Sequence, residues 1–270
     1  MPEFPEVFTI TNNLNELLSG SKLIEVEILD YHPKVSSIEE FSNLINEDIL
    51  EVKNISKSII FEFSNGKRIV SHLAMTGRFR FAKEKQNFGW DKLRFKFTKN
   101  NEEFYINFTD TRKFGKLEIS QKLPKEIFPN PLKYSDKEIE KITNKILNSS
   151  KTIKELLLDQ NIFSGLGNIY SNDTLHISKV NPQTKGKDLT KEKIILIIKN
   201  AQEILKEGID LGGSSLYDKM YTDIYGQEGK YQDNFKIYNL KNCKNCGNKI
   251  TKIKLGGRGT FFCEICLNNN

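Results

Sequence analysis

All four cysteines of the chain lie near its C-terminus, in two Cys-x2-Cys pairs that are separated by sixteen residues. The N-terminus has no basic segment followed by an apolar stretch and a cleavage site, so we expect no secretory signal and no disulfide bonds. Two such pairs at this separation are typical of a tetrahedral zinc site. Four thiolates leave no open position for a substrate, so the pattern predicts one structural Zn2+ per chain. The predicted ligands are Cys243, Cys246, Cys263 and Cys266.

The length of 270 residues and the balance of apolar and charged residues are those of a soluble globular protein with room for two domains. No apolar run is long enough to span a bilayer, so we expect a cytoplasmic protein without a membrane partner. The formal net charge is +6, and residues 230–270 alone hold seven lysines and one arginine against two acidic residues. This basic end suits a polyanionic partner such as DNA, although solvated lysine faces are also common.

The chain begins Met1-Pro2-Glu3. Removal of Met1 would leave Pro2 with a free secondary amine, which can attack an aldehyde-level carbon to form a covalent iminium. An α-amino group has an ordinary pKa of about 7.7–8.0, so part of it is a neutral nucleophile at physiological pH. Glu3 is close enough to donate or accept a proton at the same carbon. Many chains begin Met-Pro by chance, so this signal needs support from the rest of the sequence.

Apolar residues at helical spacing predict a helix over residues 5–19, which would hold Pro2 and Glu3 on a rigid mount. From there to residue 119, runs of β-branched and aromatic residues predict strands. The expected strands cover residues 22–31, 52–63, 68–73, 93–98, 104–108 and 115–119. Asn65-Gly66 lies between two of these strands and favours a type I′ hairpin. These segments together predict a β-sandwich that carries the N-terminal helix.

Helical periodicity dominates the second half of the chain. Ser135 begins a capping box, and further helices are expected over about 153–160, from Asn168 to about 177, and after Thr190. Residues 212–234 lack periodicity and predict a long loop, which is often functional. The expected fold is therefore α+β with four parts. They are an N-terminal catalytic β-sandwich domain (1–120), a linker (121–135), a helix-two-turns-helix domain with the loop (136–232), and a zinc ribbon (233–270).

Three further features have both a structural and a functional interpretation. Glycines before Asn168 open a helix whose unpaired amides favour a phosphate, but the same turn occurs in ordinary helix packing. Arg258 is the only long side chain at the tip of the expected ribbon hairpin, where it either contacts a phosphate or stays solvated. Met75 and Phe114 follow strand ends and would normally be core residues. With Arg112 they would instead form a wedge that unstacks DNA bases and fills the space of a flipped nucleotide.

In combination these residues resemble the formamidopyrimidine-DNA glycosylase family, which repairs oxidised bases, over essentially the whole chain. The resemblance rests on motifs in matching order and spacing. They are Met1–Val7, Ser71–Gly77, Thr109–Gly115, Asp159-Gln160 followed by Gly165–Tyr170, Gly212–Leu216 and Arg258–Cys263. Phe8 and Thr111 replace residues usual in the family, and Trp90 stands near a usual His. These departures bear on substrate detail more than on activity.

The resemblance implies a role for ten residues besides the zinc ligands. Pro2 would attack C1′ of the damaged nucleotide, and Glu3 would protonate the sugar ring oxygen and later move protons. Without the resemblance, Lys57 would be interpreted as an ordinary surface lysine. The resemblance implies that Lys57 and Arg258 contact phosphates beside the lesion and assist strand cleavage. The other implied DNA contacts are His72, Lys154 and Asn168 at backbone phosphates, and Met75, Arg112 and Phe114 in the vacated base stack.

The implied activity is that of a bifunctional DNA glycosylase and AP lyase of base excision repair. It would remove oxidised purines (8-oxoguanine and formamidopyrimidines) from double-stranded DNA through a Schiff base on Pro2, and cut the strand by β,δ-elimination. The resemblance also implies a nucleoid-associated monomer that binds DNA across the cleft between its domains. Two alternatives remain. The wedge and the long loop argue against an endonuclease VIII-like enzyme for oxidised pyrimidines, and Pro2 and Glu3 argue against a non-catalytic zinc-ribbon DNA-binding protein.

Overall fold

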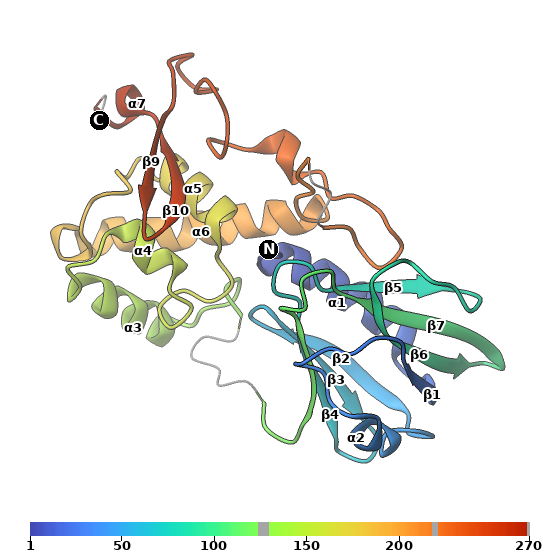
Figure 1. Ribbon diagram of the computed structural model, residues 1–270. Helices are drawn as coiled ribbons and strands as arrows, with labels where there is room; N and C mark the ends of the chain where they lie inside the picture. The colour runs from blue at the N-terminus through green and yellow to red at the C-terminus, as the bar shows by residue number, and fades with distance from the viewer. Residues whose placement is uncertain (124–129, 218–220, 269–270) are drawn as a thin grey trace. The chain divides into compact units, whose positions relative to one another are not determined.

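The computed structural model describes residues 1–123, 130–217 and 221–268, so parts of the expected linker and of the expected long loop lie outside the described residues. The chain divides into two compact units: unit 1 comprises residues 1–126 and 211–230, and unit 2 comprises residues 127–210 and 231–270. Unit 1 is built mainly of strands, whereas unit 2 combines helices with a small hairpin (Figure 1). The expected α+β class is confirmed, and the boundaries of its four expected parts stay predictions.

Unit 1 contains two four-stranded antiparallel sheets, as the predicted β-sandwich requires. The first sheet has the order β1 (Lys22–Ile28), β6 (Asp91–Lys99), β7 (Glu102–Thr109) and β5 (Arg78–Ala82). The second has the order β2 (Ile49–Ile55), β3 (Ser58–Phe63), β4 (Arg68–His72) and β8 (Lys116–Ser120). The unit also holds α1 (Phe4–Leu18) and the short α2 (Ile38–Ser42).

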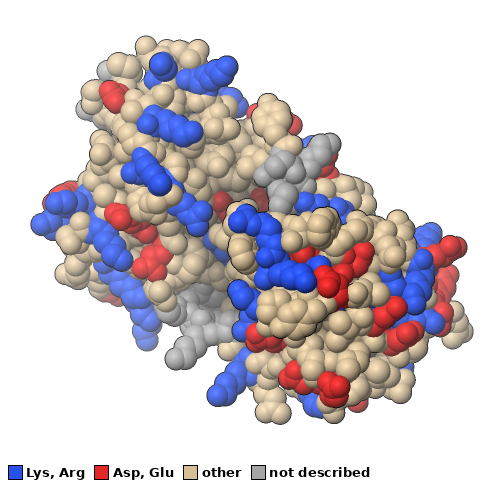
Figure 2. All heavy atoms as spheres, in the orientation of Figure 1, with Lys and Arg blue, Asp and Glu red and all other residues tan. Residues whose placement is uncertain are grey.

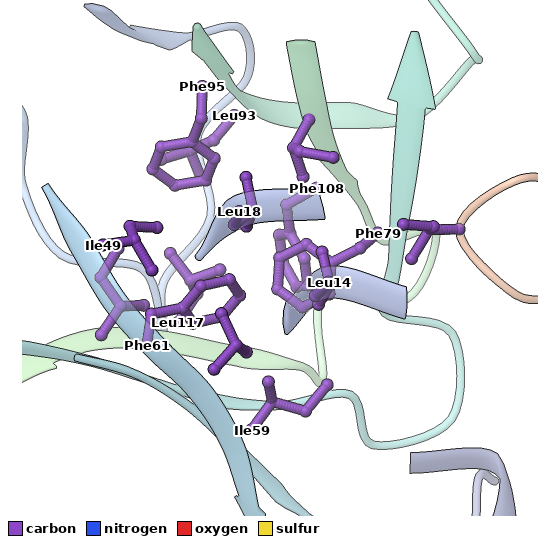
Figure 3. Close-up of a cluster of buried hydrophobic side chains, with 14 of the residues drawn as sticks. Leu14, Leu18, Ile49, Ile59, Phe61, Phe79, Leu93, Phe95, Phe108 and Leu117 are labelled. Carbon is purple, nitrogen blue, oxygen red and sulfur yellow. The ribbon is translucent and has the colours of Figure 1, made fainter. Parts of the chain in front are cut away.

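The apolar face of α1 closes the core of unit 1. Figure 3 shows Leu14 and Leu18 of this helix among side chains that come from both sheets, including Phe61 and Phe108, and all four are buried. Burial of each such side chain contributes about 1.5–3 kcal/mol relative to an exposed one. The core therefore fixes the helix, and with it the N-terminal residues that precede the helix.

Three details of the β-sandwich differ from the prediction. The run 52–63 is two strands joined by a turn at Ser56, whose φ is 53°. Strand β5 was not expected, since its arginines and phenylalanines give no long β-branched run. The hairpin at Asn65-Gly66 exists, but only Gly66 has a positive φ, so its turn is not of type I′. The loop there includes Ser64, which makes it longer than the two residues that a type I′ turn requires.

Unit 2 follows the predicted helices closely. They are α3 (Asp136–Leu147), α4 (Ile153–Leu158), α5 (Asn168–Ile177) and α6 (Lys191–Asp210). Ser135 caps α3 as expected, since its Oγ accepts from the Glu138 amide at 3.4 Å and its own amide donates to Glu138 Oε2 at 2.7 Å. The end of the chain forms β9 (Thr251–Leu255), β10 (Arg258–Phe262) and α7 (Glu264–Asn268), and single 3-10 turns occupy Gly186–Asp188 and Tyr231–Asn234. Among the described residues, no helix combines the length and apolar character needed to cross a membrane.

Candidate functional site

Pro2 and Glu3 lie at the start of α1, where both are buried. The amide of Glu3 donates to Glu6 Oε2 at 2.7 Å, so the side chain of Glu6 closes the first turn of the helix. This bond satisfies one of the amides that a helix start leaves unpaired. The expected rigid mount for the N-terminal residues is therefore present.

The direction of α1 carries its N-terminus toward Lys57. The Gly20 amide, just after the helix, donates to the Ile49 carbonyl at 2.8 Å, and Asn15 Oδ1 accepts from the Val52 amide at 2.8 Å. The helix thus runs antiparallel to β2. From Asn15 back to its start α1 rises roughly 16 Å. The same direction leads along β2 from Val52 to its end at Ile55 and then into the turn that holds Lys57. Lys57 itself is only 8% exposed, so it is not the ordinary surface lysine of the default interpretation.

Glu6 also connects α1 to a segment more than 200 residues away in sequence. Its Oε1 accepts a hydrogen bond from the Ser214 amide at 2.7 Å. Gly213 has a φ of 82°, and a Cβ there would lie 2.8 Å from Glu6 Cγ. The second half of the loop is held as well, because the Phe81 amide donates to the Ile224 carbonyl at 2.9 Å. The described parts of the long loop expected over residues 212–234 are therefore anchored within unit 1, and its first part lies beside the N-terminal residues.

We expect Gly213→Ala to detach this loop. The substitution adds both backbone strain and a clash with Glu6, so it should destabilise the protein by about 1–3 kcal/mol. Limited proteolysis should show faster cleavage within residues 211–230. Gly66→Ala is the matched control, because Gly66 also has a positive φ but a Cβ added there would have no atom within 4 Å. Equal protease sensitivity in the two variants would contradict the role of the Glu6 contact.

A group of cationic side chains surrounds His72. Burial lowers the pKa of His72 most, and the positive charges of Lys57, Lys116 and Lys34 lower it further. His72 Nδ1 accepts a hydrogen bond from the Ala74 amide at 3.2 Å. This concentration of positive charge at the end of β4 is an environment that favours an anion such as phosphate.

The three expected wedge residues lie together and reach solvent. Met75 is 41% exposed and Phe114 is 48% exposed, which excludes the interpretation of both as core residues. Arg112 Nη1 lies 3.4 Å from Met75 Sδ, and the Arg112 guanidinium lies 5.0 Å from the centre of the Phe114 ring. Residues from two separate loops thus form one apolar and cationic projection.

In unit 2, the start of α5 packs against the ribbon hairpin. Asn168 Nδ2 donates to the Gly259 carbonyl at 3.1 Å, and the Phe261 amide donates to Asn172 Oδ1 at 2.8 Å. Lys154 is fully buried, and its ammonium donates to Ser171 Oγ at 2.6 Å and to the Asn168 carbonyl at 3.3 Å. Lys154 therefore supports the first turn of α5 from within, and its direct contact with a phosphate stays a prediction.

Arg258 begins β10 directly after the hairpin turn, and it is exposed. Gly256 and Gly257 both have positive φ, as a two-residue type I′ turn requires. The cross-strand partner of Arg258 is Leu255. The turn leaves Arg258 as the long side chain at the tip, in agreement with the expected hairpin.

Figure 2 shows that Lys and Arg side chains are spread over the visible faces of both units.

The four cysteines fit a zinc ion. The sulfur atoms of Cys243, Cys246, Cys263 and Cys266 all lie within 4.8 Å of one another. The Sγ atoms are 3.7 Å apart between Cys243 and Cys266 and 3.4 Å apart between Cys246 and Cys263. Zinc–sulfur bonds of about 2.3 Å in a tetrahedron place sulfur atoms about 3.8 Å apart. Among the described residues, the donor set and its spacing therefore support the predicted site.

The residues that hold the site together gave no signal along the chain. Glu6 lies within the N-terminal motif, but nothing in the sequence indicates its contact with Ser214. Asp110 lies inside a quoted motif, but its pairing with His32 and Thr76 joins three separate segments. Spacing along the chain does not predict such long-range pairs.

Models of known families match three parts of the chain. The formamidopyrimidine-DNA glycosylase N-terminal domain matches residues 1–117, and the H2TH domain of the same enzyme matches residues 127–220. A zinc finger found in this glycosylase and in IleRS matches residues 241–269. The matches include the N-terminal residues, the wedge loops and all four cysteines.

Similar proteins cover almost the whole chain. The formamidopyrimidine-DNA glycosylase of Mycoplasma mobile is 40% identical, with 98% of each chain covered, and that of Lactococcus lactis subsp. lactis is 35% identical, with 98% of this chain and 99% of the relative covered. A solved complex of the Lactococcus lactis Fpg with abasic-site DNA has a TM-score of 0.84 at 32% identity, with 98% of each chain covered. A complex of that enzyme with DNA containing N7-benzyl-Fapy-dG has a TM-score of 0.87 at 34% identity, with 98% of this chain and 99% of that chain covered. The chain therefore belongs to the formamidopyrimidine-DNA glycosylase family of DNA-repair enzymes.

Proposed function

We propose that this protein is a bifunctional DNA glycosylase and AP lyase that removes oxidised purines, with Pro2 as its nucleophile. The observation that carries the proposal is the junction at the start of α1, where Glu6 bonds to both Glu3 and the Ser214 loop. An N-terminal amine has no precise position unless the helix behind it is fixed, and the core fixes this helix. The same junction brings a loop for reading a base next to the reactive end of the chain.

The chemistry uses groups that the N-terminal segment supplies. After removal of Met1, the Pro2 amine attacks C1′ of the flipped nucleotide, and the bond from C1′ to the base breaks as the base leaves with a proton. Glu3 protonates the ring oxygen, so that the sugar opens and the C1′–nitrogen bond becomes an iminium. The iminium acidifies the neighbouring C2′ proton, whose removal expels the 3′ phosphate. A second elimination expels the 5′ phosphate.

DNA contacts would come from both units. In unit 1 we assign Lys57 and His72 to contacts with phosphates. The side chains that would fill the space left by the flipped nucleotide are Met75, Arg112 and Phe114. In unit 2 we assign Lys154, Asn168 and Arg258 to contacts with phosphates, and Lys154 also supports the first turn of α5. Extrusion of a nucleotide costs a few kcal/mol, which wedge insertion and phosphate contacts offset. The solved relatives bound to damaged DNA support this assignment.

Zinc would serve the ribbon rather than the reaction. Cys243, Cys246, Cys263 and Cys266 would hold one ion, which supplies a rigid cross-link beneath the hairpin. Their four thiolates fill a tetrahedral coordination sphere. Arg258, at the hairpin tip, would depend on that cross-link for its position.

Borohydride trapping tests the proposal. The protein with a mature Pro2 terminus is incubated with a duplex containing 8-oxoguanine, and sodium borohydride reduces any iminium to a stable adduct. We expect a covalent protein–DNA adduct and, without borohydride, a gap with phosphates at both ends. The absence of an adduct on a duplex that the protein binds would refute the mechanism.

Substrate choice separates this proposal from its endonuclease VIII-like alternative. The Lactococcus lactis Fpg has been crystallised with DNA containing an oxidised pyrimidine, so binding of such DNA does not distinguish the two. Excision rates on matched duplexes do distinguish them. We expect 8-oxoguanine and formamidopyrimidines to be released faster than oxidised pyrimidines, and the reverse order would favour the alternative.

The position of His72 among lysines predicts a pH dependence of DNA binding. Burial and the lysine charges hold its pKa below 6.5 in the free protein. A bound phosphate would raise that pKa, so binding takes up a proton between the bound and the free pKa values. Affinity should therefore increase as pH falls through this window and level off below the free-state pKa. Fluorescence anisotropy from pH 8 to 5.5 measures this, and His72→Gln should flatten the profile. If the affinity of His72→Gln depends on pH as steeply as that of the wild type, a group other than His72 takes up the proton.

A further inference from the structure

Asp110 joins several segments of unit 1. Its carboxylate accepts hydrogen bonds from the amides of Arg112 at 3.1 Å and Gly115 at 2.7 Å, and from the hydroxyl of Thr76. His32 Nε2 lies 3.1 Å from the same carboxylate, and neither of these two side chains is exposed. The loops that carry the wedge are therefore tied to one buried group.

The tautomer of His32 follows from its second hydrogen bond. His32 Nδ1 accepts from the Lys34 amide at 3.1 Å, so the proton lies on Nε2 and is donated to Asp110. Burial alone would raise the pKa of Asp110, but the bonds from Thr76, His32, Gly115 and the following backbone outweigh it and lower that pKa. The charged form of Asp110 is thus the one that this network favours.

Five exposed side chains extend from this network. Met75, Arg112 and Phe114 form the wedge. Tyr31 precedes His32 and is 74% exposed, and Trp90 is 67% exposed while its carbonyl accepts from the Asp110 amide at 3.1 Å. We call these five residues the Asp110 surface. Lys113 lies beside Tyr31: its ammonium is 5.9 Å from the centre of the Tyr31 ring and 3.1 Å from Asp30 Oδ2, with which it forms an ion pair.

Trp90 stands on a backbone that is both strained and fixed. Its φ is 61°, which is unusual for a bulky residue, and it follows Gly89 at 80°. The buried Arg94 holds the loop by donating to the Gln86 carbonyl at 3.0 Å and to Asn87 Oδ1. Folding gains little from an indole that stays two-thirds in solvent. A strained backbone that presents such a side chain indicates a binding role.

We propose that Trp90 and Tyr31 contact DNA, and that they extend the wedge into one continuous surface against the bases and sugars beside the lesion. The proposal rests on the proposed function, because the wedge defines where the DNA lies. Aromatic side chains interleaved with the exposed Arg112 are the composition that stacks on bases while a cation contacts the backbone. The common bonds to Asp110 hold the wedge and the two added aromatics in one rigid frame.

The proposed contact is aromatic, and this separates it from a phosphate contact. Loss of one cation at a phosphate lowers the slope of log Kd against log salt by about one. Loss of an aromatic contact weakens binding but leaves that slope unchanged. The two kinds of contact therefore differ in a measurement that is independent of affinity itself.

Trp90 is the only tryptophan in the chain, so its fluorescence reports this surface directly. The full-length protein is titrated with a duplex that carries one stable abasic-site analogue, and binding is followed separately by the anisotropy of labelled DNA. We expect tryptophan emission to fall in parallel with binding, because a base or sugar covers the indole. Unchanged emission at saturation would overturn the proposal for Trp90.

Substitutions provide the second measurement. Trp90→Gly removes the indole and accepts the positive φ, so its thermal midpoint should not fall, whereas its Kd should rise about tenfold at an unchanged salt slope. Tyr31→Ala should weaken binding in the same manner. Lys57→Gln should instead reduce the slope by about one. Leu50→Ala is the matched control: it is 59% exposed, but it lies at the end of β2 that pairs with Phe63, away from the His72 end.

Wild-type affinity in Trp90→Gly and Tyr31→Ala, or a slope reduced by one in either, would refute the aromatic contact. Borohydride trapping by the wild type on an abasic-site duplex tests the proposed function separately. An adduct together with unaffected affinity in both variants would reject the Asp110 surface and leave the enzyme assignment in place. Binding that depends on Trp90 without any adduct would reject the Pro2 chemistry instead.

Discussion

A protein that carries any residue ahead of Pro2 should bind damaged DNA normally but lose almost all of its excision activity. Extension converts the Pro2 amine into an amide, which is not a nucleophile, while the core that holds α1 is unchanged. Removal of the nucleophile lowers the catalytic rate by many orders of magnitude in the best-studied enzymes. We therefore expect the rate of excision to fall by on the order of 10³-fold or more. Gel assays of base release and strand cleavage measure the loss, and anisotropy measures the retained affinity.

Pro2→Gly separates the identity of the amine from its position. Glycine at the mature terminus presents a primary amine on the same helix, so trapping should fall sharply while DNA binding persists. The comparison variant is Glu3→Gln, which keeps the amine but removes the proton donor and should slow excision by about 10²–10⁴-fold. Full excision by an extended protein would show that another residue is the nucleophile, whereas equal trapping by Pro2→Gly would show that the secondary amine is not required.

Removal of the metal should unfold the ribbon and weaken DNA binding more than tenfold. An isolated two-stranded hairpin is marginally stable in water, and the small core around Cys243, Ile250 and Phe261 is not large enough to hold it alone. Structural zinc contributes about 10–16 kcal/mol in comparable small domains. Without the ion the hydrogen bonds from α5 to the ribbon should break, and Arg258 should lose its position.

Chelation is the direct test of the zinc site, with protease sensitivity of residues 243–268 and DNA affinity as the two measurements. Added zinc should restore both in the wild type. Cys263→Ser should show the loss without chelator and should not recover. If chelated protein keeps a protease-resistant ribbon, the four sulfur atoms do not depend on a metal for their arrangement.

Much of the architecture follows from local patterns. Periodic apolar residues were sufficient for α1, α3 and α6, and the cysteine spacing was sufficient for the ribbon. The prediction of strands and turns was wrong where a short sequence pattern was compatible with two local structures. The run 52–63 contained enough β-branched residues for one strand, but a turn at Ser56 divides it. Asn65-Gly66 satisfied the composition of a type I′ turn, but the length of the loop decided its conformation.

The candidate site was predicted in its parts rather than in its arrangement. The N-terminal residues, the wedge and the hairpin tip each lie in short motifs, and each is positioned by neighbours that are distant in sequence. The family resemblance implied that Lys154 contacts a phosphate, and that contact stays a prediction. No motif indicated that its ammonium also donates to Ser171 Oγ and to the Asn168 carbonyl.

The sequence by itself determined the chemistry that is available: a proline amine, an adjacent carboxylate, four thiolates at zinc spacing, and an Arg-tipped hairpin. These features are local, because residue types and short spacings specify them. The tertiary structure alone decided that Glu6 bonds to Ser214 and that Asp110 joins His32, Thr76 and the wedge loop. Such contacts depend on how helices and sheets pack around a shared core, and packing brings together residues that no local pattern relates.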